Sequence, residues 1–205
     1  MSANVVIEPA TEADLDELSE LLGELFSEEK DFRPNKQKQL RGLRLIFEQP
    51  NRGRVFVLRR DNAIVGMINL LFTISTAEGG FVMILEDLVV HDEYRGHGYG
   101  SKLLQHAIDF AKEKNFLRVT LLTDRPELRS QALFRRFGFH DSSMMPMRLL
   151  LTPAVERAAT TRIVPGATAP SVTGAPFRVS LALQSQCKVR SLISVSTSLS
   201  VTRSP

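Results

Sequence analysis

The chain has 205 residues, of which 43% are hydrophobic and 24% charged, and its formal net charge is +3. These proportions are typical of a folded domain with a buried core, which excludes a disordered chain and a peptide-sized scaffold. The single cysteine, Cys187, permits no internal disulfide. The sequence shows no secretory leader and no apolar run long enough to span a bilayer. We therefore expect a cytoplasmic protein that does not enter a membrane.

The composition changes near Pro153. Residues 153–205 contain 15 Ser or Thr, five Pro, six basic side chains and one acid, a net charge of +5 that leaves the first 152 residues at −2. We predict a folded domain over residues 1–152 and a disordered or loosely attached tail over 153–205. Two alternatives stay open: the end of the tail adds a pair of strands, or the tail binds a partner. Because the positive charge belongs to the tail, we expect no nucleic-acid binding by the domain.

Hydrophobic periodicity predicts an α/β fold for the domain. The predicted elements are, in chain order, a strand at 5–7, a helix that begins at the Thr11–Asp14 capping box and runs through 15–26, a helix at 35–47, strands at 55–58, 63–75 and 81–90, a helix at 98–114, a strand at 117–122, a helix that opens at Pro126 and ends at Gly138, and a strand at 144–151. This order indicates a mixed, mostly antiparallel central sheet flanked by helices.

The sharpest local pattern is a glycine turn between a strand and the most regular helix. A four-residue link separates the strand that ends at Val90 from the run Arg95-Gly96-His97-Gly98-Tyr99-Gly100-Ser101. Glycines tolerate positive φ, and the first N–H groups of a helix attract anions. A dinucleotide fingerprint needs glycine where Ser101 stands, and a P-loop needs the order G-K-[ST], so both are excluded. A turn that only packs the helix is the competing interpretation.

The same residues carry a resemblance to a known family. Arg95-Gly96-His97-Gly98-Tyr99-Gly100 resembles the R/Q-x-x-G-x-G/A signature of the GNAT family of N-acetyltransferases, and the element order over 4–151 is similar to that family's. The resemblance implies an acyl-CoA N-acyltransferase fold with acetyl-CoA as co-substrate. In the family, the signature holds the pyrophosphate and the preceding strand end pairs with the pantetheine arm. This assigns the pyrophosphate to Arg95, Gly96, His97, Gly98, Tyr99, Gly100 and Ser101, and the arm to Leu88 and Val90.

A nearby carboxylate is a candidate general base. An amine attacks a thioester only when neutral, whereas a lysine-like amine with a pKa of about 10.4 is mostly protonated at neutral pH. Strand alternation is expected to place Glu86 and Asp87 on opposite faces, with Glu86 on the face of Leu88 and Val90. Leu85-Glu86-Asp87-Leu88 also resembles the L-E-D stretch of polyamine acetyltransferases, whose glutamate is assigned as the base. Glu86 is therefore the candidate base, and binding a cationic substrate or capping the sheet is its alternative role.

The sequence predicts no general acid. The family often has a tyrosine four residues before the closing Gly-Phe, and here that position is Phe134, which has no proton to give. A thiol with a pKa of about 8.5 leaves tolerably as thiolate. Water, or one of the two tyrosines, Tyr94 and Tyr99, are the remaining candidates.

The other polar side chains have ordinary interpretations. The histidines are expected at the surface or in turns, and no pair has metal-ligand spacing, so no metal is expected. The acidic residues of the first helix are interpreted as a solvated face that would also favour cationic amines. These are Glu12, Asp14, Asp16, Glu17, Glu20 and Glu24.

Three function hypotheses follow. The first is an N-acetyltransferase that moves the acetyl group of acetyl-CoA to a primary amine, of a small molecule or a peptide, by direct attack. The second, motivated by Phe134, is a catalytically silent acyl-CoA-binding module that senses or scaffolds. The third, a nucleic-acid binder, is suggested only by the net charge. The expected partner is an amine substrate, with a homodimer left open and no nucleic acid or membrane.

Overall fold

The structure is a computed structural model that describes residues 3–29, 31–123 and 128–151. The chain divides into two units, Met1–Met145 and Pro146–Pro205. The elements, all in the first unit, are β1 (Val5–Pro9), the 3₁₀ turn η1 (Glu12–Asp14), α1 (Leu15–Glu28), α2 (Lys36–Glu48), β2 (Gly53–Arg60), β3 (Ala63–Ser75), β4 (Gly80–Val90), the 3₁₀ turn η2 (Asp92–Tyr94), α3 (Tyr99–Glu113), β5 (Val119–Leu121) and α4 (Leu128–Arg136).

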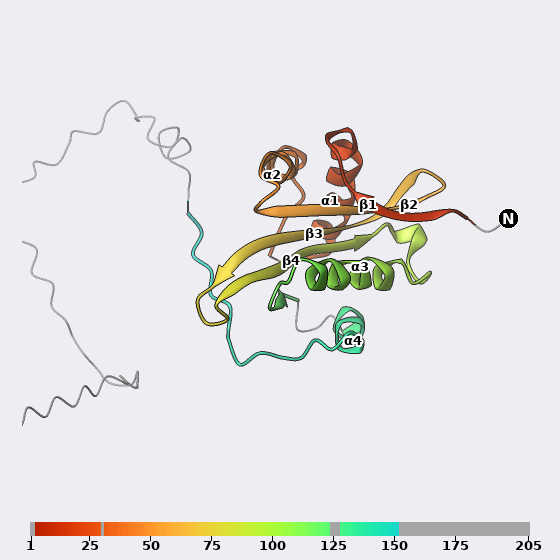
Figure 1. Ribbon diagram of the computed structural model, residues 1–205. Coiled ribbons are helices and arrows are strands. Elements are labelled where there is room, and N and C mark those ends of the chain that lie inside the picture. The colour runs from red at the N-terminus through yellow and green to blue at the C-terminus, as the bar shows by residue number, and fades with distance from the viewer. Residues whose placement is uncertain (1–2, 30, 124–127, 152–205) are drawn as a thin grey trace, which may run out of the picture. The chain divides into compact units, whose positions relative to one another are not determined.

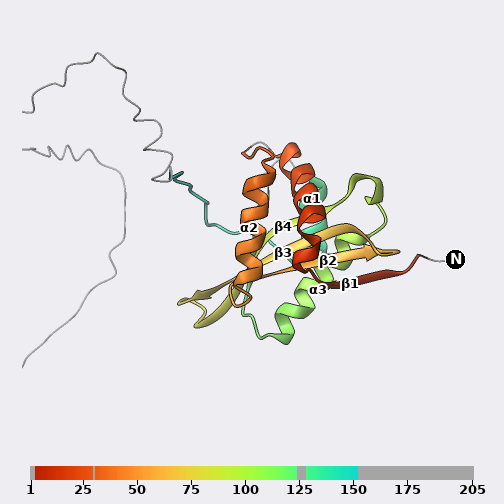
Figure 2. The same cartoon turned by 90° about the horizontal axis from the view of Figure 1, so that it is seen from above.

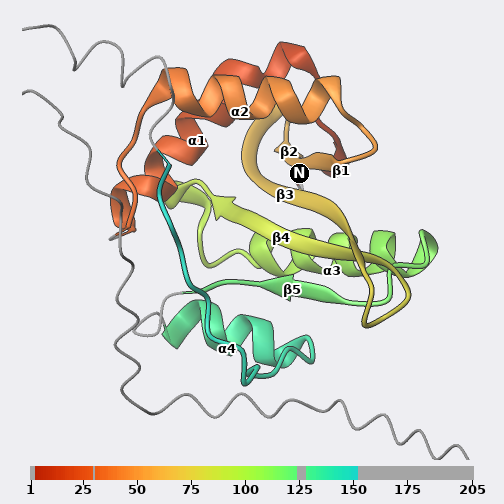
Figure 3. The same ribbon diagram turned by 90° about the vertical axis from the view of Figure 1, so that its left-hand side faces the viewer.

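Five strands form one mixed sheet in the order β1-β2-β3-β4-β5 (Figure 1). The pairs from β1 to β4 are antiparallel, and β4 pairs with β5 in parallel. Helices α1 and α2 lie side by side across one face (Figure 2), and α3 and α4 lie on the other (Figure 3). The predicted α/β fold with a mostly antiparallel sheet flanked by helices is confirmed.

Two apolar clusters fill the two faces of the sheet. Both clusters include residues of β4: Val89 packs under α1 and α2, whereas Leu88 and Val90 pack toward α3. Each fully buried leucine contributes on the order of 1.5–3 kcal/mol of transfer free energy. The end of β4 is therefore held from both sides. Side chains with no exposed surface in these clusters include Leu18 and Met67 on the first face, and Leu58, Leu70, Met83, Leu103 and Leu104 on the second.

The buried Asp14 holds the junction between β1 and α1. Its Oδ2 accepts from the backbone N–H of Thr11 at 2.8 Å, and its Oδ1 accepts from Nη2 of Arg59 at 2.7 Å. Nε of Arg59 also donates to Oε1 of Glu8 at 2.6 Å. Burial alone raises the pKa of Asp14, but the hydrogen bonds from Arg59 and Thr11, with the charge of Arg59, outweigh it and hold the pKa below its ordinary value. The predicted capping box is thus tied to the sheet through β2.

The predicted hairpin between β2 and β3 is confirmed. Asp61 and Asn62 connect the two strands with φ values of 51° and 75°. Positive φ at both central residues is typical of a type I′ turn, whose twist matches that of the flanking strands. Asp and Asn adopt positive φ more readily than most residues.

The predicted final strand at 144–151 is wrong, because residues 144–151 belong to no strand. The side chains of Met144, Met147 and Leu150 are 82%, 94% and 84% exposed, so none of the residues that the structure describes buries them. Pro146 also lacks the N–H that a ladder requires. The strand predicted at 117–122 is shorter than expected, at Val119–Leu121.

Two further predictions concern residues that the structure does not describe. Pro126, the expected first-turn proline of the last helix, lies outside the described residues, and so does the predicted tail at 153–205. The domain boundary at residue 152 stays a prediction. Among the described residues, no helix is long and apolar enough to cross a bilayer.

We expect Asp14→Asn to lower the free energy of unfolding by about 1–3 kcal/mol at pH 7, because it removes the buried charge that Arg59 contacts. The pKa of Asp14 is lower in the folded than in the unfolded protein. Its stabilisation is therefore present above the ordinary value of 3.8 and is lost as the pH falls through the folded-state value. Urea unfolding at pH 7 and pH 3 measures both effects. The control is Asp16→Asn, whose side chain is 82% exposed. An equal loss of unfolding free energy at pH 7 in this control would contradict the stabilising role of Asp14.

Candidate active site

A β-bulge lies in β4 at Glu86. Asn69 of β3 pairs with Asp87, whereas the next residue, Leu70, pairs with Leu85, so Glu86 is the extra residue of β4. Leu85 and Leu88 pack into the same apolar cluster although they are three positions apart. Side-chain alternation along β4 is therefore broken between Leu85 and Leu88, and the predicted face of Glu86 stays a prediction. The bulge leaves the Glu86 side chain exposed beside a buried Asp87.

A buried polar pair spans the two strands at this bulge. Nδ2 of Asn69 donates to Oδ2 of Asp87 at 2.8 Å, and the residues are only 4% and 9% exposed. Burial raises the pKa of Asp87 to about 6; the hydrogen bond from Asn69 lowers it in part and the nearby Glu86 carboxylate adds to the rise. Because the two side chains come from directly paired residues, this bond fixes the register at which the bulge forms.

Sequence reasoning considered Asp87 only for its face of the strand and did not pair it with Asn69. A signal was available, because each is a polar residue within a strongly apolar strand run, Met67–Phe72 in one case and Leu85–Val90 in the other. A buried polar residue of this kind needs a partner, and two such residues on adjacent predicted strands are candidates for each other. Of the two neighbouring carboxylates in β4, only Glu86 is accessible to a substrate.

The edge of β4 becomes open just beyond the bulge. Its parallel pairing with β5 covers Met83–Leu85, and no described residue continues that ladder. On the other side, the N–H of His91 donates to the carbonyl of Val65 at 3.0 Å. Because successive peptide groups of a strand point to opposite sides, the carbonyl of Val90 points away from β3, and Leu88 has the same orientation. Leu88 and Val90 therefore present backbone groups along an open strand edge.

The glycine turn follows this edge and has the geometry of an anion site. Gly96 and Gly98 have φ values of +81° and +78°, which L side chains rarely adopt, and a Cβ at either position would point into open space. Gly98 is the N-cap of α3, and the helix makes its first internal bond from Lys102 N–H to the Gly98 carbonyl at 3.1 Å. The N–H groups of Tyr99–Ser101 therefore have no acceptor within the helix and can receive an anion.

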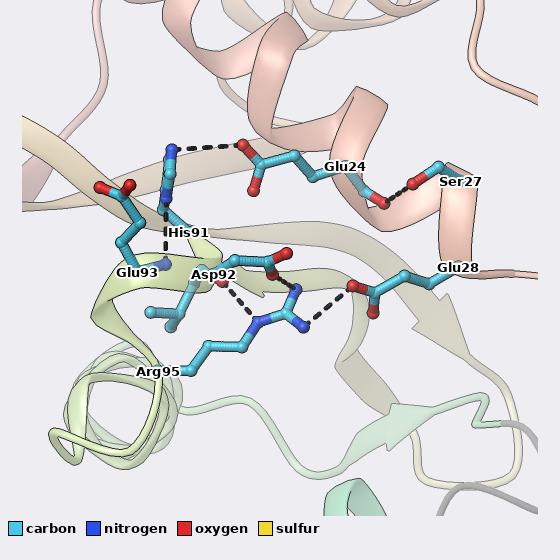
Figure 4. Close-up of polar contacts among 8 residues, drawn as sticks. Glu24, Ser27, Glu28, His91, Asp92, Glu93 and Arg95 are labelled. Carbon is cyan, nitrogen blue, oxygen red and sulfur yellow. Dashed lines mark hydrogen bonds and ion pairs between the residues drawn. The ribbon is translucent and has the colours of Figure 1, made fainter.

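The Arg95 side chain is held away from these N–H groups. Its Nε donates to the Val90 carbonyl at 3.0 Å, Nη1 lies 2.9 Å from Oε1 of Glu28, and Nη2 lies 2.7 Å from Oδ1 of Asp92 (Figure 4). His97 is part of the turn, and its ring stacks on that of Tyr99 with centroids 5.9 Å apart. The structure thus brings the predicted residues Gly96–Ser101 together in one turn, with the guanidinium of Arg95 directed toward α1.

Phe134 lies in α4 and packs into the core cluster under α3. Its ring meets that of Phe139 edge to face, with centroids 5.9 Å apart. Tyr99 is 7% exposed and belongs to the same cluster. The guanidinium carbon of Arg60 lies over the ring of Tyr94, 5.4 Å from the ring centroid. The described residues contain no group of three or more His, Cys, Asp or Glu arranged to hold a metal ion.

The chain belongs to the acetyltransferase (GNAT) family, whose sequence model matches residues 15–139. The expected family and its acyl-CoA N-acyltransferase fold are therefore confirmed. The match covers α1 through the end of the Phe137-Gly138-Phe139 segment and so includes the bulge, the open edge and the glycine turn.

Solved structures share this fold. A possible acetyltransferase from Clostridium difficile 630 has a TM-score of 0.66 at 15% identity, covering 73% of this chain and 99% of that one. The aminoglycoside N-acetyltransferase AAC(6')-Iy in complex with CoA has a TM-score of 0.62 at 15% identity, covering 73% and 97%. A transcriptional regulator from Bacillus halodurans C-125 has a TM-score of 0.61 at 26% identity, covering 72% and 100%. A search of curated proteins finds no match.

We expect the buried carboxylate of Asp87 to make the protein less stable as the pH rises from about 4 to 6. Its pKa is about 6 in the folded protein and 3.8 ordinarily, so the folded state binds the extra proton between these values. Asp87→Asn keeps an oxygen that can accept from Asn69 and should raise the free energy of unfolding at pH 7 by about 1–3 kcal/mol. Urea unfolding between pH 4 and pH 7 should show a flatter profile than the wild type. A profile as steep as that of the exposed control Asp109→Asn would contradict the assignment.

Proposed function

We propose that the protein transfers the acetyl group of acetyl-CoA to a primary amine by direct attack. The observation that carries the proposal is the continuity between the open edge at Leu88 and Val90 and the anion-binding turn at Gly96–Ser101. A ligand with an extended amide-containing arm and a pyrophosphate fits this order of sites. The similar fold solved with CoA supports the same ligand class. We place this activity in the cytoplasm, as expected from the sequence.

The protein's own residues supply binding and orientation. The free N–H groups at the start of α3 would hold the pyrophosphate, and the helix dipole adds to their attraction for an anion. The outward backbone groups of Leu88 and the outward N–H of Val90 would pair with the arm as a strand pairs with its neighbour, while the Val90 carbonyl accepts from Arg95. Acetyl-CoA supplies the activated thioester. This binding places the thioester near the bulge, where β4 and β5 separate.

Glu86 is the proposed proton acceptor. The amine nitrogen attacks the thioester carbonyl and loses its proton, directly or through one water, to the exposed carboxylate of Glu86. The C–S bond then breaks and the thiolate leaves. Since Phe134 has no proton to give, the thiolate is protonated by water or leaves unprotonated, which its ordinary pKa of about 8.5 permits.

Glu86→Gln should lower kcat by about 10²- to 10⁴-fold, because the amide cannot accept the amine proton. The affinity for acetyl-CoA should stay within about twofold, since Glu86 contributes to neither the turn nor the outward peptide groups at Leu88 and Val90. The loss should shrink at high pH, where the free amine is more abundant. Steady-state kinetics with thiol detection and calorimetry measure these effects, with the exposed Glu113→Gln as the matched control. Unchanged turnover at neutral pH would remove Glu86 from the mechanism.

A catalytically silent acyl-CoA-binding module is the second candidate, favoured by the apolar surroundings of Phe134. A panel of polyamines, aminoglycosides and lysine peptides, assayed for released CoA, distinguishes the two. We expect turnover with at least one primary amine and none with nucleic acid. Binding of acetyl-CoA without turnover across the panel would favour the silent module. Sedimentation of the same sample reports whether the protein is a homodimer.

A further inference from the structure

Two acidic residues of α1, one helical turn apart, contact both ends of the link between β4 and the glycine turn. Oε1 of Glu24 lies 3.4 Å from Nε2 of His91, and Oε1 of Glu28 lies 2.9 Å from Nη1 of Arg95 (Figure 4). His91 and Arg95 immediately flank η2. We call these four residues the α1 bridge. Through it, α1 contacts the segment that connects the two halves of the proposed acetyl-CoA site.

All three nitrogens of the Arg95 guanidinium have partners in this arrangement. Besides Glu28, the guanidinium reaches Asp92 and, through Nε, the outward carbonyl of Val90. A guanidinium presents its N–H groups in a fixed planar fork, so these contacts set the direction of the whole group. Two carboxylates also offset its charge. Arg95 therefore adds little positive charge to the anion site, although it is the first residue of the signature.

We infer that Arg95 is a positioning residue, which the α1 bridge uses to hold the glycine turn in register with the end of β4, and that it does not bind the pyrophosphate with its own charge. The identity of the anion rests on the proposed function, whereas the bridge itself does not. The Arg95 side chain thus holds the carbonyl of Val90, and its backbone leads directly into Gly96 at the start of the glycine turn. This differs from the sequence-based assignment of Arg95 to the pyrophosphate.

The contacts of the bridge should order the turn locally and contribute little to global stability. The side chains of Arg95, Glu28 and Asp92 are 42%, 51% and 63% exposed, and ion pairs this exposed contribute little to global unfolding. A turn joined to the rest of the molecule by a short link is sensitive to such local contacts. The effect of breaking the bridge is therefore expected in ligand affinity and local exchange, with nearly unchanged thermal unfolding.

The direction in which Glu28→Ala changes the affinity for acetyl-CoA distinguishes a positioning role of Arg95 from binding through its charge. If Arg95 bound the pyrophosphate through its charge, Glu28→Ala would free the guanidinium, remove a repulsive carboxylate and tighten acetyl-CoA binding. If the bridge positions the turn, the same substitution loosens binding. Glu17→Ala, an exposed acidic residue of the same helix outside these contacts, removes the same charge and is the matched control.

Calorimetric titration with acetyl-CoA is the first test. We expect the Kd to rise about three- to ten-fold in Glu28→Ala and to stay within about twofold in Glu17→Ala. Arg95→Lys keeps the charge but loses the planar fork, so it should weaken binding as Glu28→Ala does. Binding by Glu28→Ala that equals or exceeds the wild type, or wild-type affinity in Arg95→Lys, would overturn the inference.

Amide hydrogen exchange of the ligand-free protein is the second test. The N–H groups of Tyr94, Arg95 and Lys102 donate to backbone carbonyls around the turn. We expect their exchange to accelerate about three- to ten-fold in Glu28→Ala and to be unchanged in Glu17→Ala. Equal exchange in both variants would refute the bridge. Failure of the wild type to bind acetyl-CoA would instead refute the proposed function, and the exchange measurement would still decide the role of the bridge.

Discussion

The hydrogen bond between Asn69 and Asp87 is the constraint on which the rest of the site depends. It joins two polar side chains inside an otherwise apolar sheet, where an unpaired amide or carboxylate is costly. Because the two residues are directly paired, a shift of β4 by one position would separate them. The bond therefore selects one register, and that register places the extra residue at Glu86. Burial of the Asp87 carboxylate raises its pKa, and the hydrogen bond that the same carboxylate accepts favours a single pairing of the two strands.

The bulge also explains why the proposed binding edge and the proposed base lie next to each other. Before it, β4 is paired on both sides; beyond it, only β3 remains as a partner among the described residues. The same interruption exposes a carboxylate and leaves outward peptide groups along the edge. Packing of Val89 on one face and Leu88 on the other holds this half-paired end of the strand from both sides. A strand that leads into a glycine turn can then present its free edge and the start of α3 to one extended ligand.

The sequence was sufficient for the architecture, whereas the location of the site stays a prediction. Strong periodicity marked α1, α2 and α3, and the chemistry of Asp61-Asn62 and Gly96–Gly98 specified turns that need positive φ. The bulge was not predictable, because it depends on which residue of β3 faces which residue of β4, and a single strand read alone shows only alternation. The final strand failed for a related reason: an apolar run such as Met144–Leu151 becomes a strand only when an edge accepts it. Glu24 and Glu28 look like solvated residues in the sequence, since their partners come from a segment more than 60 positions away.

The exposed segment at 144–151 has a practical consequence. A segment outside helices and strands, with methionine and leucine side chains more than 70% exposed, is a good substrate for proteases that cleave after apolar residues. Digestion under native conditions is expected to cut within this segment and to leave the sheet, with its glycine turn and bulge, as a resistant fragment. Such a fragment would be the natural material for crystallisation and for separating the properties of the catalytic fold from those of the residues that follow it.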